Sequence, residues 1–304
     1  MSGNVVLQTF DGFRELYPFD SRFFLLGDLR YHYLDEGQGD PIVLLHGNPT
    51  WSFYYRHMIK DLRAGYRVIA PDHMGCGFSD KPQIYDYRLD RHIINLEALI
   101  SHLGLNRITL VMHDWGGPIG MGYAARHSEN VKRLVFLNTV AFWSPRIPMI
   151  LRICRIPFLG GFTIRGLNLF ALIATYVACR NRERMTRDVR AGYLLPYDSY
   201  RNRIAHLRFV EDIPVNSSHP SYSSLRAIED SLPRFRNHPI LIIWGEGDPV
   251  FVPALLDDWT RWFPEASVKR IPDAGHYVLE DAYERIIPWV REFLEQNPVK
   301  RAAE

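Results

Sequence analysis

The stretch RITLVMHDWGG, residues 107–117, decides the fold of this chain. Its first half is apolar and rich in β-branched residues, as in a buried strand, and the small residues Gly116 and Gly117 follow where a helix would begin. Asp114 stands at the turn between the two. A sharp strand-to-helix turn lifts one side chain above the edge of a sheet and is a typical position for a nucleophile. A carboxylate is already charged at neutral pH, so Asp114 could attack an electrophilic carbon without the help of a base.

The same stretch also permits a simpler interpretation. Met112 stands two places before Asp114, where this kind of turn usually has a glycine. An aspartate just before a helix can also cap that helix by accepting hydrogen bonds from its first N–H groups. The choice between a nucleophile and a helix cap therefore depends on whether catalytic partners occur elsewhere in the chain.

Apolar runs of β type alternate with longer helical patterns on both sides of this stretch. Such alternation predicts an α/β fold with a mostly parallel sheet and crossover helices. The predicted strands are residues 41–47, 66–72, 107–114, 131–139, 239–248 and 266–276. Polar and Gly-rich residues gather at the carboxyl end of each strand, where open α/β sheets place their sites.

The alternation stops between residues 140 and 236. Prolines and glycines there divide helical patterns into short pieces, and no strand-turn-helix unit is recognisable. We therefore predict a helical cap domain, residues 140–236, over the strand ends of a core domain that comprises residues 1–139 and 237–304.

A carboxylate and a histidine follow Asp114 in the chain order nucleophile, acid, histidine. His276 lies in a Gly-containing loop after the last predicted strand and is the expected general base. The strand before it ends in Glu246 and Asp248, and we predict that Asp248, just past a Gly-x-Gly turn, orients His276, with Glu246 as the second choice. The other place for an acid, after the strand that follows Asp114, carries Asn138 and no carboxylate.

Two further residues are predicted to bind a developing anion. The loop after the strand 41–47 and the residue after the nucleophile supply the oxyanion-hole N–H groups in this arrangement, and these positions are Asn48 and Trp115. Both also carry a side-chain N–H donor, and neither can act as a base. The pair could therefore hold a leaving halide or an oxyanion without a cationic residue.

Composition narrows the class of protein. Among 304 residues the formal net charge is only +2, which gives no reason to expect nucleic acid as a partner. Three scattered cysteines predict neither disulfides nor a metal site, so a reducing, cytoplasmic location is expected. No apolar stretch reaches the length of about 20 residues that a transmembrane helix needs. The glycine clusters lack nucleotide-binding spacing, and we expect no cofactor.

Five motifs, taken in order, resemble the haloalkane dehalogenase family of α/β-hydrolases. They are HGNPTW (46–51), DHMGCGFSDKP (72–82), HDWGG (113–117), WGEGD (244–248) and DAGHYVLED (273–281). The resemblance implies an eight-stranded, mostly parallel sheet with helices on both faces and a helical cap inserted after the sixth strand. Asn48 with Trp115 looks like the halide-binding pair, and Asp248 looks like the acid of the Asp-His-Asp branch of that family.

The same branch holds the cis-β-lactone decarboxylases of bacterial long-chain olefin biosynthesis. The predicted cap, with RIPMILRICRIPFLGGFTIRGLNLFA (146–171) and LRFVEDIPVNSSHPSY (207–222), looks most like theirs. The resemblance implies conversion of a cis-3,4-dialkyl β-lactone, an apolar small molecule, to a cis-alkene and carbon dioxide. It also implies assembly with the β-lactone synthetase and other enzymes of olefin biosynthesis.

Three alternatives stay open at this point. A haloalkane dehalogenase would use the same residues to displace a halide and hydrolyse the resulting ester. An epoxide hydrolase shares the aspartate nucleophile but has a pair of cap tyrosines. A non-catalytic ligand receptor would not need all five predicted site residues. The sequence does not define the alkyl chain length, the ring carbon attacked, the cap residues that line the pocket or the oligomeric state.

Overall fold

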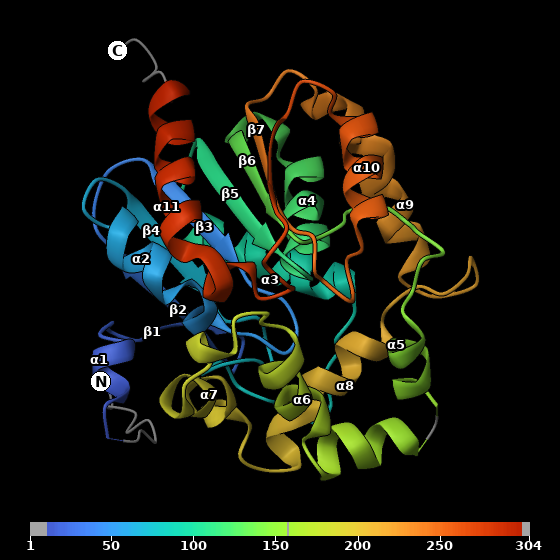
Figure 1. Cartoon of the computed structure of the whole chain (residues 1–304). Helices are drawn as coiled ribbons and strands as arrows, with labels where there is room; N and C mark the ends of the chain where they lie inside the picture. Colours follow the sequence, from blue (N-terminus) through green and yellow to red (C-terminus); the bar gives the residue numbers. More distant parts are fainter. Residues whose placement is uncertain (1–10, 157, 300–304) are drawn as a thin grey trace.

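A computed structural model describes residues 11–156 and 158–299, and its centre is one eight-stranded sheet (Figure 1). The strand order is β1-β2-β4-β3-β5-β6-β7-β8, antiparallel from β1 to β4 and parallel from there to β8. The strands are β1 (Arg22–Leu26), β2 (Leu29–Glu36), β3 (Pro41–Leu45), β4 (Arg67–Pro71), β5 (Ile108–His113), β6 (Val131–Leu137), β7 (Ile240–Gly245) and β8 (Ser267–Ile271). The predicted fold class is confirmed, and all six strands that the sequence located are present.

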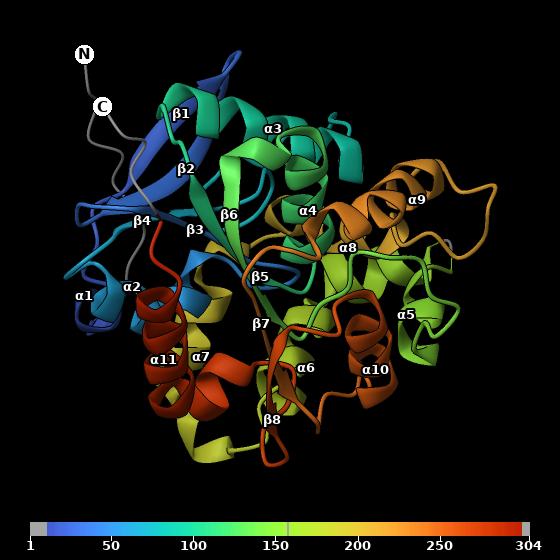
Figure 2. The same cartoon turned by 90° about the horizontal axis from the view of Figure 1, so that it is seen from above.

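Helices cover both faces of the sheet. Successive side chains of a strand point to opposite faces, so Leu110 and Met112 of β5 enter one apolar cluster and Val111 enters the other. The first cluster includes helices α3, α4 and α10, and the second includes α1, α2 and α11; α3 and α4 lie on the opposite side from α2 and α11 in Figure 2. Their bounds are α1 (Phe13–Leu16), α2 (Arg56–Leu62), α3 (Leu89–His102), α4 (Gly116–Arg126), α10 (Pro253–Trp262) and α11 (Val278–Gln296).

The chain between β6 and β7, residues 138–239, is the insert. In Figure 1 its elements α5 to α8 lie at one end of the strands, below the carboxyl ends of the parallel strands. Helix α9 instead packs against α3 and α4, beside the core. The insert contains α5 (Met149–Cys154), the π-helical turn η3 (Gly161–Gly166), α6 (Leu169–Val177), α7 (Arg187–Leu194), α8 (Ile204–Glu211) and α9 (Tyr222–Ser231). The described residues also form the 3-10 turns η1 (Ser52–Tyr55), η2 (Ser128–Asn130), η4 (Arg182–Arg184), η5 (Leu195–Tyr197), η6 (Arg201–Arg203) and η7 (Leu232–Phe235).

The hairpin β1–β2 is the part of the sheet that the sequence pattern did not locate. Its two strands pair from Leu26 with Leu29 outward, so Gly27 and Asp28 alone form the turn. Gly27 has a φ of 63°, a left-handed conformation that a two-residue hairpin turn requires and glycine adopts without strain. The hairpin lies at the edge of the sheet, and Leu25 is largely exposed. Its apolar pattern is therefore weaker than that of a central strand.

A buried ion pair joins two helices of the core to the insert. Arg56 of α2 donates through Nη2 to Oε2 of Glu280 in α11 at 2.8 Å, and its Nη1 bonds the other carboxylate oxygen. Both side chains are only 2% exposed. Tyr193 of α7 donates its hydroxyl to Glu280 at 2.5 Å. Burial alone would raise the pKa of Glu280, but Arg56 and Tyr193 lower it below its usual value, so the carboxylate remains charged.

Candidate active site

Asp114 stands at the turn between β5 and α4, at the carboxyl end of a central strand, and the residue is 8% exposed. Its φ of 50° is left-handed, the strained backbone of a nucleophile elbow. A side chain at Gly116 would overlap the carbonyl oxygen of Leu45, and one at Gly117 would overlap the hydroxyl of Thr139. The small residues after Asp114 therefore allow α4 to begin directly against the strand.

Met112, which departs from the usual elbow pattern, is accommodated by a glycine in α4. Met112 is fully buried, and its sulfur lies where a side chain at Gly120 would have to stand. Gly120, about one turn into α4, thus leaves room for the Met112 side chain. A glycine two places before Asp114 would not have needed this room. The elbow forms in spite of the departure.

Main-chain N–H groups bind the Asp114 carboxylate. The N–H of Asn48 donates to Oδ1 at 2.6 Å, and the N–H of Trp115 stabilises the same carboxylate. A side chain at Gly47 would occupy the position of Oδ1, so glycine is required there. Asn48 and Trp115 thus meet at Asp114 through their backbone N–H groups, and Oδ2 is the carboxylate oxygen near His276.

His276 lies between the carboxylates of Asp248 and Asp114, the two predicted catalytic acids. Its Nδ1 is 2.9 Å from Oδ2 of Asp248, and its Nε2 is 3.8 Å from Oδ2 of Asp114. The second distance is too long for a hydrogen bond, and it separates the base from the nucleophile by enough for a reacting group to interact with both. Glu246, the second choice for the acid, instead pairs with Arg270 at the surface.

Asp248 has a complete set of hydrogen-bond donors. Its Oδ1 accepts the N–H groups of Val250 at 2.7 Å and Phe251 at 3.0 Å. Its Oδ2 accepts Nδ2 of Asn138 at 2.9 Å as well as His276. Asn138 itself is fixed to Gly245 by hydrogen bonds in both directions. The sequence pointed to Asn138 only as a missing acid, whereas the structure gives it the role of holding the acid that is present.

Asp281 anchors the loop that carries His276, and it was not among the predicted site residues. Its carboxylate accepts the N–H of Gly275 at 2.7 Å, directly before His276. It also accepts the N–H groups of Asn181 at 2.7 Å and Arg180 at 3.0 Å, which belong to the insert. The one available signal was its place in the motif DAGHYVLED. Asp281 therefore joins the histidine loop to the insert.

The side chains predicted to bind an anion both contact helix α8. Nδ2 of Asn48 donates to the carbonyl oxygen of His206 in α8 at 3.2 Å, which uses one of its two N–H groups. The indole of Trp115 is half-buried and packs against Phe209, with ring centroids 5.2 Å apart. The role of these two side chains stays a prediction.

Burial changes the acidity of the nucleophile and of the base. Burial raises the pKa of Asp114 by more than His276 and the N–H groups of Asn48 and Trp115 lower it, so the pKa lies above its usual value. Burial would lower the pKa of His276, but the carboxylates of Asp248 and Asp114 outweigh it, so the pKa lies above its usual value too. Asp114 therefore needs a higher pH than an exposed aspartate to be fully ionised.

This shift predicts a pH dependence of the reaction. Only ionised Asp114 can attack, so kcat/KM should fall with decreasing pH through a pKa above the ordinary value of about 3.9. Initial rates as a function of pH measure this pKa, and circular dichroism at each pH separates it from acid unfolding. A rate that stays constant down to a pH of about 4 would contradict the assigned nucleophile.

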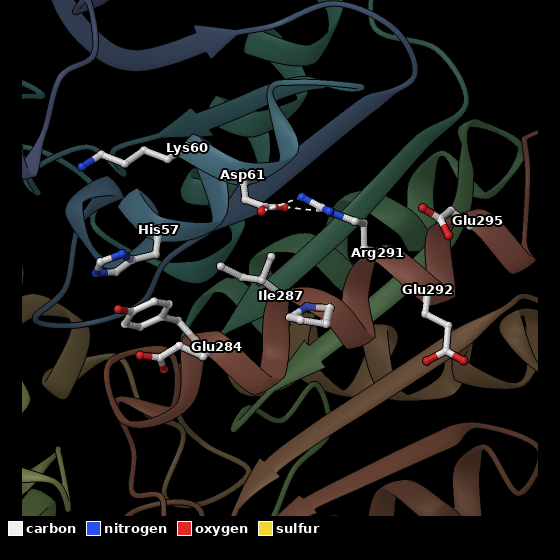
Figure 3. A pocket seen from close by; sticks show the side chains of 10 residues that line it. His57, Lys60, Asp61, Glu284, Ile287, Arg291, Glu292 and Glu295 are labelled. Carbon is white, nitrogen blue, oxygen red and sulfur yellow. Dashed lines mark hydrogen bonds and ion pairs between the residues drawn. The ribbon is translucent and has the colours of Figure 1, made fainter.

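A hollow of about 570 Å³ lies away from this site, between α2 and α11 (Figure 3). Its lining is mostly charged, and Asp61 and Arg291 form an ion pair across it. None of the predicted site residues lines it.

Within the described residues, no three His, Cys, Asp or Glu side chains are grouped as metal ligands. No described helix is both long and apolar enough to cross a bilayer.

Comparison with known proteins agrees with this geometry. A family model described as the alpha/beta hydrolase fold matches residues 40–283. A protein from Shewanella oneidensis named cis-3-alkyl-4-alkyloxetan-2-one decarboxylase is 46% identical, covering 93% of this chain and 90% of its own. A protein of the same name from Xanthomonas campestris is 42% identical, covering 88% and 93%.

Haloalkane dehalogenases are similar over the same length at lower identity. Haloalkane dehalogenase 2 from Mycobacterium tuberculosis is 33% identical, covering 90% of this chain and 94% of its own. The crystal structure of a loop variant of the haloalkane dehalogenase DbeA from Bradyrhizobium elkanii superposes with a TM-score of 0.83 at 24% identity, covering 91% and 97%. The chain therefore belongs to the alpha/beta hydrolase fold family, among relatives that include cis-3-alkyl-4-alkyloxetan-2-one decarboxylases and haloalkane dehalogenases.

Proposed function

We propose that the protein is a β-lactone decarboxylase, which converts cis-3,4-dialkyl oxetan-2-ones to cis-alkenes and carbon dioxide. The observation that carries the choice of substrate is the identity of 46% and 42% to two decarboxylases over about nine tenths of the chain, against 33% and 35% for two haloalkane dehalogenases. The site supports the chemistry because Asp114 is a buried, oriented carboxylate with one oxygen bound and the other facing His276.

Asp114 opens the ring at the saturated carbon that carries the ring oxygen. Oδ2 forms a bond to this carbon, the carbon–oxygen bond of the ring breaks, and the electron pair leaves as a carboxylate. Attack at the carbonyl carbon would instead expel an alkoxide, a much poorer leaving group, and would not prepare the loss of carbon dioxide. The side-chain N–H groups of Asn48 and Trp115 hold the released carboxylate in the position where a dehalogenase would hold a halide.

Loss of carbon dioxide then releases the enzyme. The carbon–carbon bond to the carboxylate breaks, its electron pair forms the alkene, and the bond to Asp114 breaks to restore the free aspartate. Attack from the side opposite the ring oxygen places Asp114 anti to the carboxylate, so elimination without bond rotation keeps the alkyl groups cis. No water or net proton enters, and His276 acts as a cation beside the carboxylates, which its raised pKa favours.

The remaining parts of the proposal concern the surroundings of the site. Residues 140–236 act as the cap domain, because α8 contacts Asn48 through His206 and α7 contacts Trp51 through Gly192. A cytoplasmic location suits the three cysteines, all of which are free. An assembly with the enzyme that closes the lactone ring would deliver an insoluble substrate directly.

Haloalkane dehalogenase is the second candidate, because His276 is oriented by Asp248 and stands beside Asp114 as a base for water would. An epoxide hydrolase needs free cap tyrosines. Tyr193 donates to Glu280, and the hydroxyl of Tyr197 is bound to Gly77 and Thr50. These bonds make the epoxide hydrolase the least favoured of the three enzymes.

The test is to give the enzyme a long-chain cis-β-lactone or 1-bromobutane in oxygen-18 water. We expect alkene and carbon dioxide from the lactone, and no heavy oxygen in Asp114 by mass spectrometry of its peptide. Hydrolysis of an alkyl ester by water would place heavy oxygen in Asp114 during bromobutane turnover. Rapid bromide release without alkene from the lactone would establish the dehalogenase instead.

A further inference from the structure

The outer surface of the insert carries most of the exposed large apolar side chains of the described chain. Fifteen large apolar residues are exposed in all, and twelve of them lie between residues 149 and 177. We call these twelve the apolar face: Met149, Ile150, Ile153, Ile156, Phe158, Leu159, Phe162, Leu167, Leu172, Ile173, Tyr176 and Val177. Single exposed apolar residues are ordinary, but such a concentration marks a surface that contacts something other than water.

Helix α6 shows the character of this surface most clearly. Its inner side buries Ala171 and Thr175, which are 3% and 1% exposed. Its outer side presents Leu172, Ile173 and Val177, between 37% and 53% exposed. A surface helix of a water-soluble domain normally has a polar outer side, whereas a helix that is apolar all round is covered on all sides. The outer side of α6 therefore has the composition of a covered surface.

The segment that carries the apolar face has charges of one sign only. Residues 140–182 contain six arginines and no aspartate or glutamate: Arg146, Arg152, Arg155, Arg165, Arg180 and Arg182. Arg146 pairs with Asp258 of the core. No carboxylate of the described residues lies within ion-pair distance of Arg152 or Arg165, which stand in the same segments as the apolar residues. The partner of this face is therefore both apolar and anionic.

We propose that the apolar face binds the surface of a lipid bilayer that contains anionic phospholipids. Leucine, isoleucine and phenylalanine side chains enter the boundary between headgroups and acyl chains, and the arginines contact lipid phosphates, as in helices that lie in the plane of a membrane. Binding in the plane of the surface needs no membrane-spanning helix, and none of the described helices is long and apolar enough to be one.

A second copy of the chain fits this face less well. A symmetric dimer would place the same patch against itself, so two segments that contain arginines and no carboxylate would face each other. A bilayer offers acyl chains and phosphates together. If the proposed function holds, it also dissolves the dialkyl lactone and the alkene, since each buried methylene favours transfer from water. Binding itself needs only the insert and does not depend on that function.

The experiment measures binding of the whole protein to vesicles by co-sedimentation, without substrate. We expect tight binding to vesicles of phosphatidylcholine and phosphatidylglycerol in equal amounts, and weaker binding to phosphatidylcholine alone. The double substitution Phe158→Asp and Phe162→Asp should weaken binding to both by at least about tenfold, because two aromatic side chains no longer enter the lipid. Arg152→Glu should weaken binding to the anionic vesicles by about fivefold or more, and high salt should do the same.

Ile84→Asp is the matched control, because Ile84 is 97% exposed, like Phe158 at 94%, but lies outside the apolar face. It should bind like the parent protein, and circular dichroism should show all variants folded. Absence of binding by the parent would overturn the proposal, as would equal binding by the parent and the double variant. A dimer that the double variant abolishes, without any lipid binding, would overturn it in favour of a second copy. Turnover of a detergent-dispersed lactone tests the proposed function separately.

Discussion

Replacing Asp114 with Ala should reduce kcat/KM by at least about 10⁴-fold, because no other group of the site can form the covalent bond. The other oxygens near the reacting position are committed: Oδ2 of Asp248 binds His276 and Asn138, and its Oδ1 binds two main-chain N–H groups. Initial rates of alkene formation measure the loss. Product formation at more than about a hundredth of the parent rate would exclude Asp114 as the nucleophile.

The folded state should not suffer from losing this carboxylate. Because burial raises the pKa of Asp114, its charge costs free energy in the folded protein at neutral pH. Asp114→Asn removes the charge, keeps an acceptor for the N–H of Asn48, and should melt at the parent temperature or above. Asp273→Ala serves as the control and should keep its activity. Asp273 is an exposed carboxylate in the loop before His276, and its ion pair within the described residues is with Arg285.

Glu280→Gln should lower the free energy of unfolding by roughly 3–5 kcal/mol, the usual cost of removing one partner of a buried ion pair. Arg56 is 1% exposed and would keep its charge with only the carbonyl oxygen of Phe53 and a neutral amide as acceptors. Tyr193 would lose a charged acceptor at the same time. Urea unfolding at neutral pH measures the difference.

The exposed pair of Asp61 and Arg291 provides the comparison. It has two hydrogen bonds, like the buried pair, but its side chains are 30% and 51% exposed, so Asp61→Asn should cost less than about 1 kcal/mol. Equal costs for the two variants would show that burial does not decide the strength of these pairs.

The stabilisation by Glu280 should also depend on pH. The pKa of Glu280 is lowered by folding, so its contribution to the free energy of unfolding is complete above the unfolded pKa of about 4.3 and is lost as the pH falls below it. The difference in free energy of unfolding between the parent and Glu280→Gln should shrink in the same pH range.

The sequence predicted those features that a local pattern encodes. The strand before Asp114, the small residues after it and the order of Asp114, Asp248 and His276 are all visible in short segments, and the structure brings these three side chains together. Elbows and strand ends are recognisable because each requires specific residue types within a few positions.

The features that the sequence did not predict depend mainly on contacts between distant segments. Asn138 and Asp248 are 110 positions apart, and no property of Asn138 alone indicates that it would hold a carboxylate. The hydrogen bond from Asn48 to Asp114 uses a main-chain N–H, which every residue but proline possesses. The β1–β2 hairpin was missed in spite of its Gly-Asp turn, because an edge strand needs only part of the apolar pattern.

The double role of Asp281 has a thermodynamic consequence. The same carboxylate binds Gly275 of the histidine loop and Arg180 and Asn181 of the insert, and the N–H of Tyr277 binds Ala178 at 2.8 Å. The arrangement of the insert and the position of His276 are thus linked variables. A ligand that prefers one arrangement of the insert shifts the population of the catalytic position of His276 by the same coupling free energy, and the coupling is reciprocal. Ligand binding beneath the insert and the catalytic placement of His276 are then governed by one equilibrium.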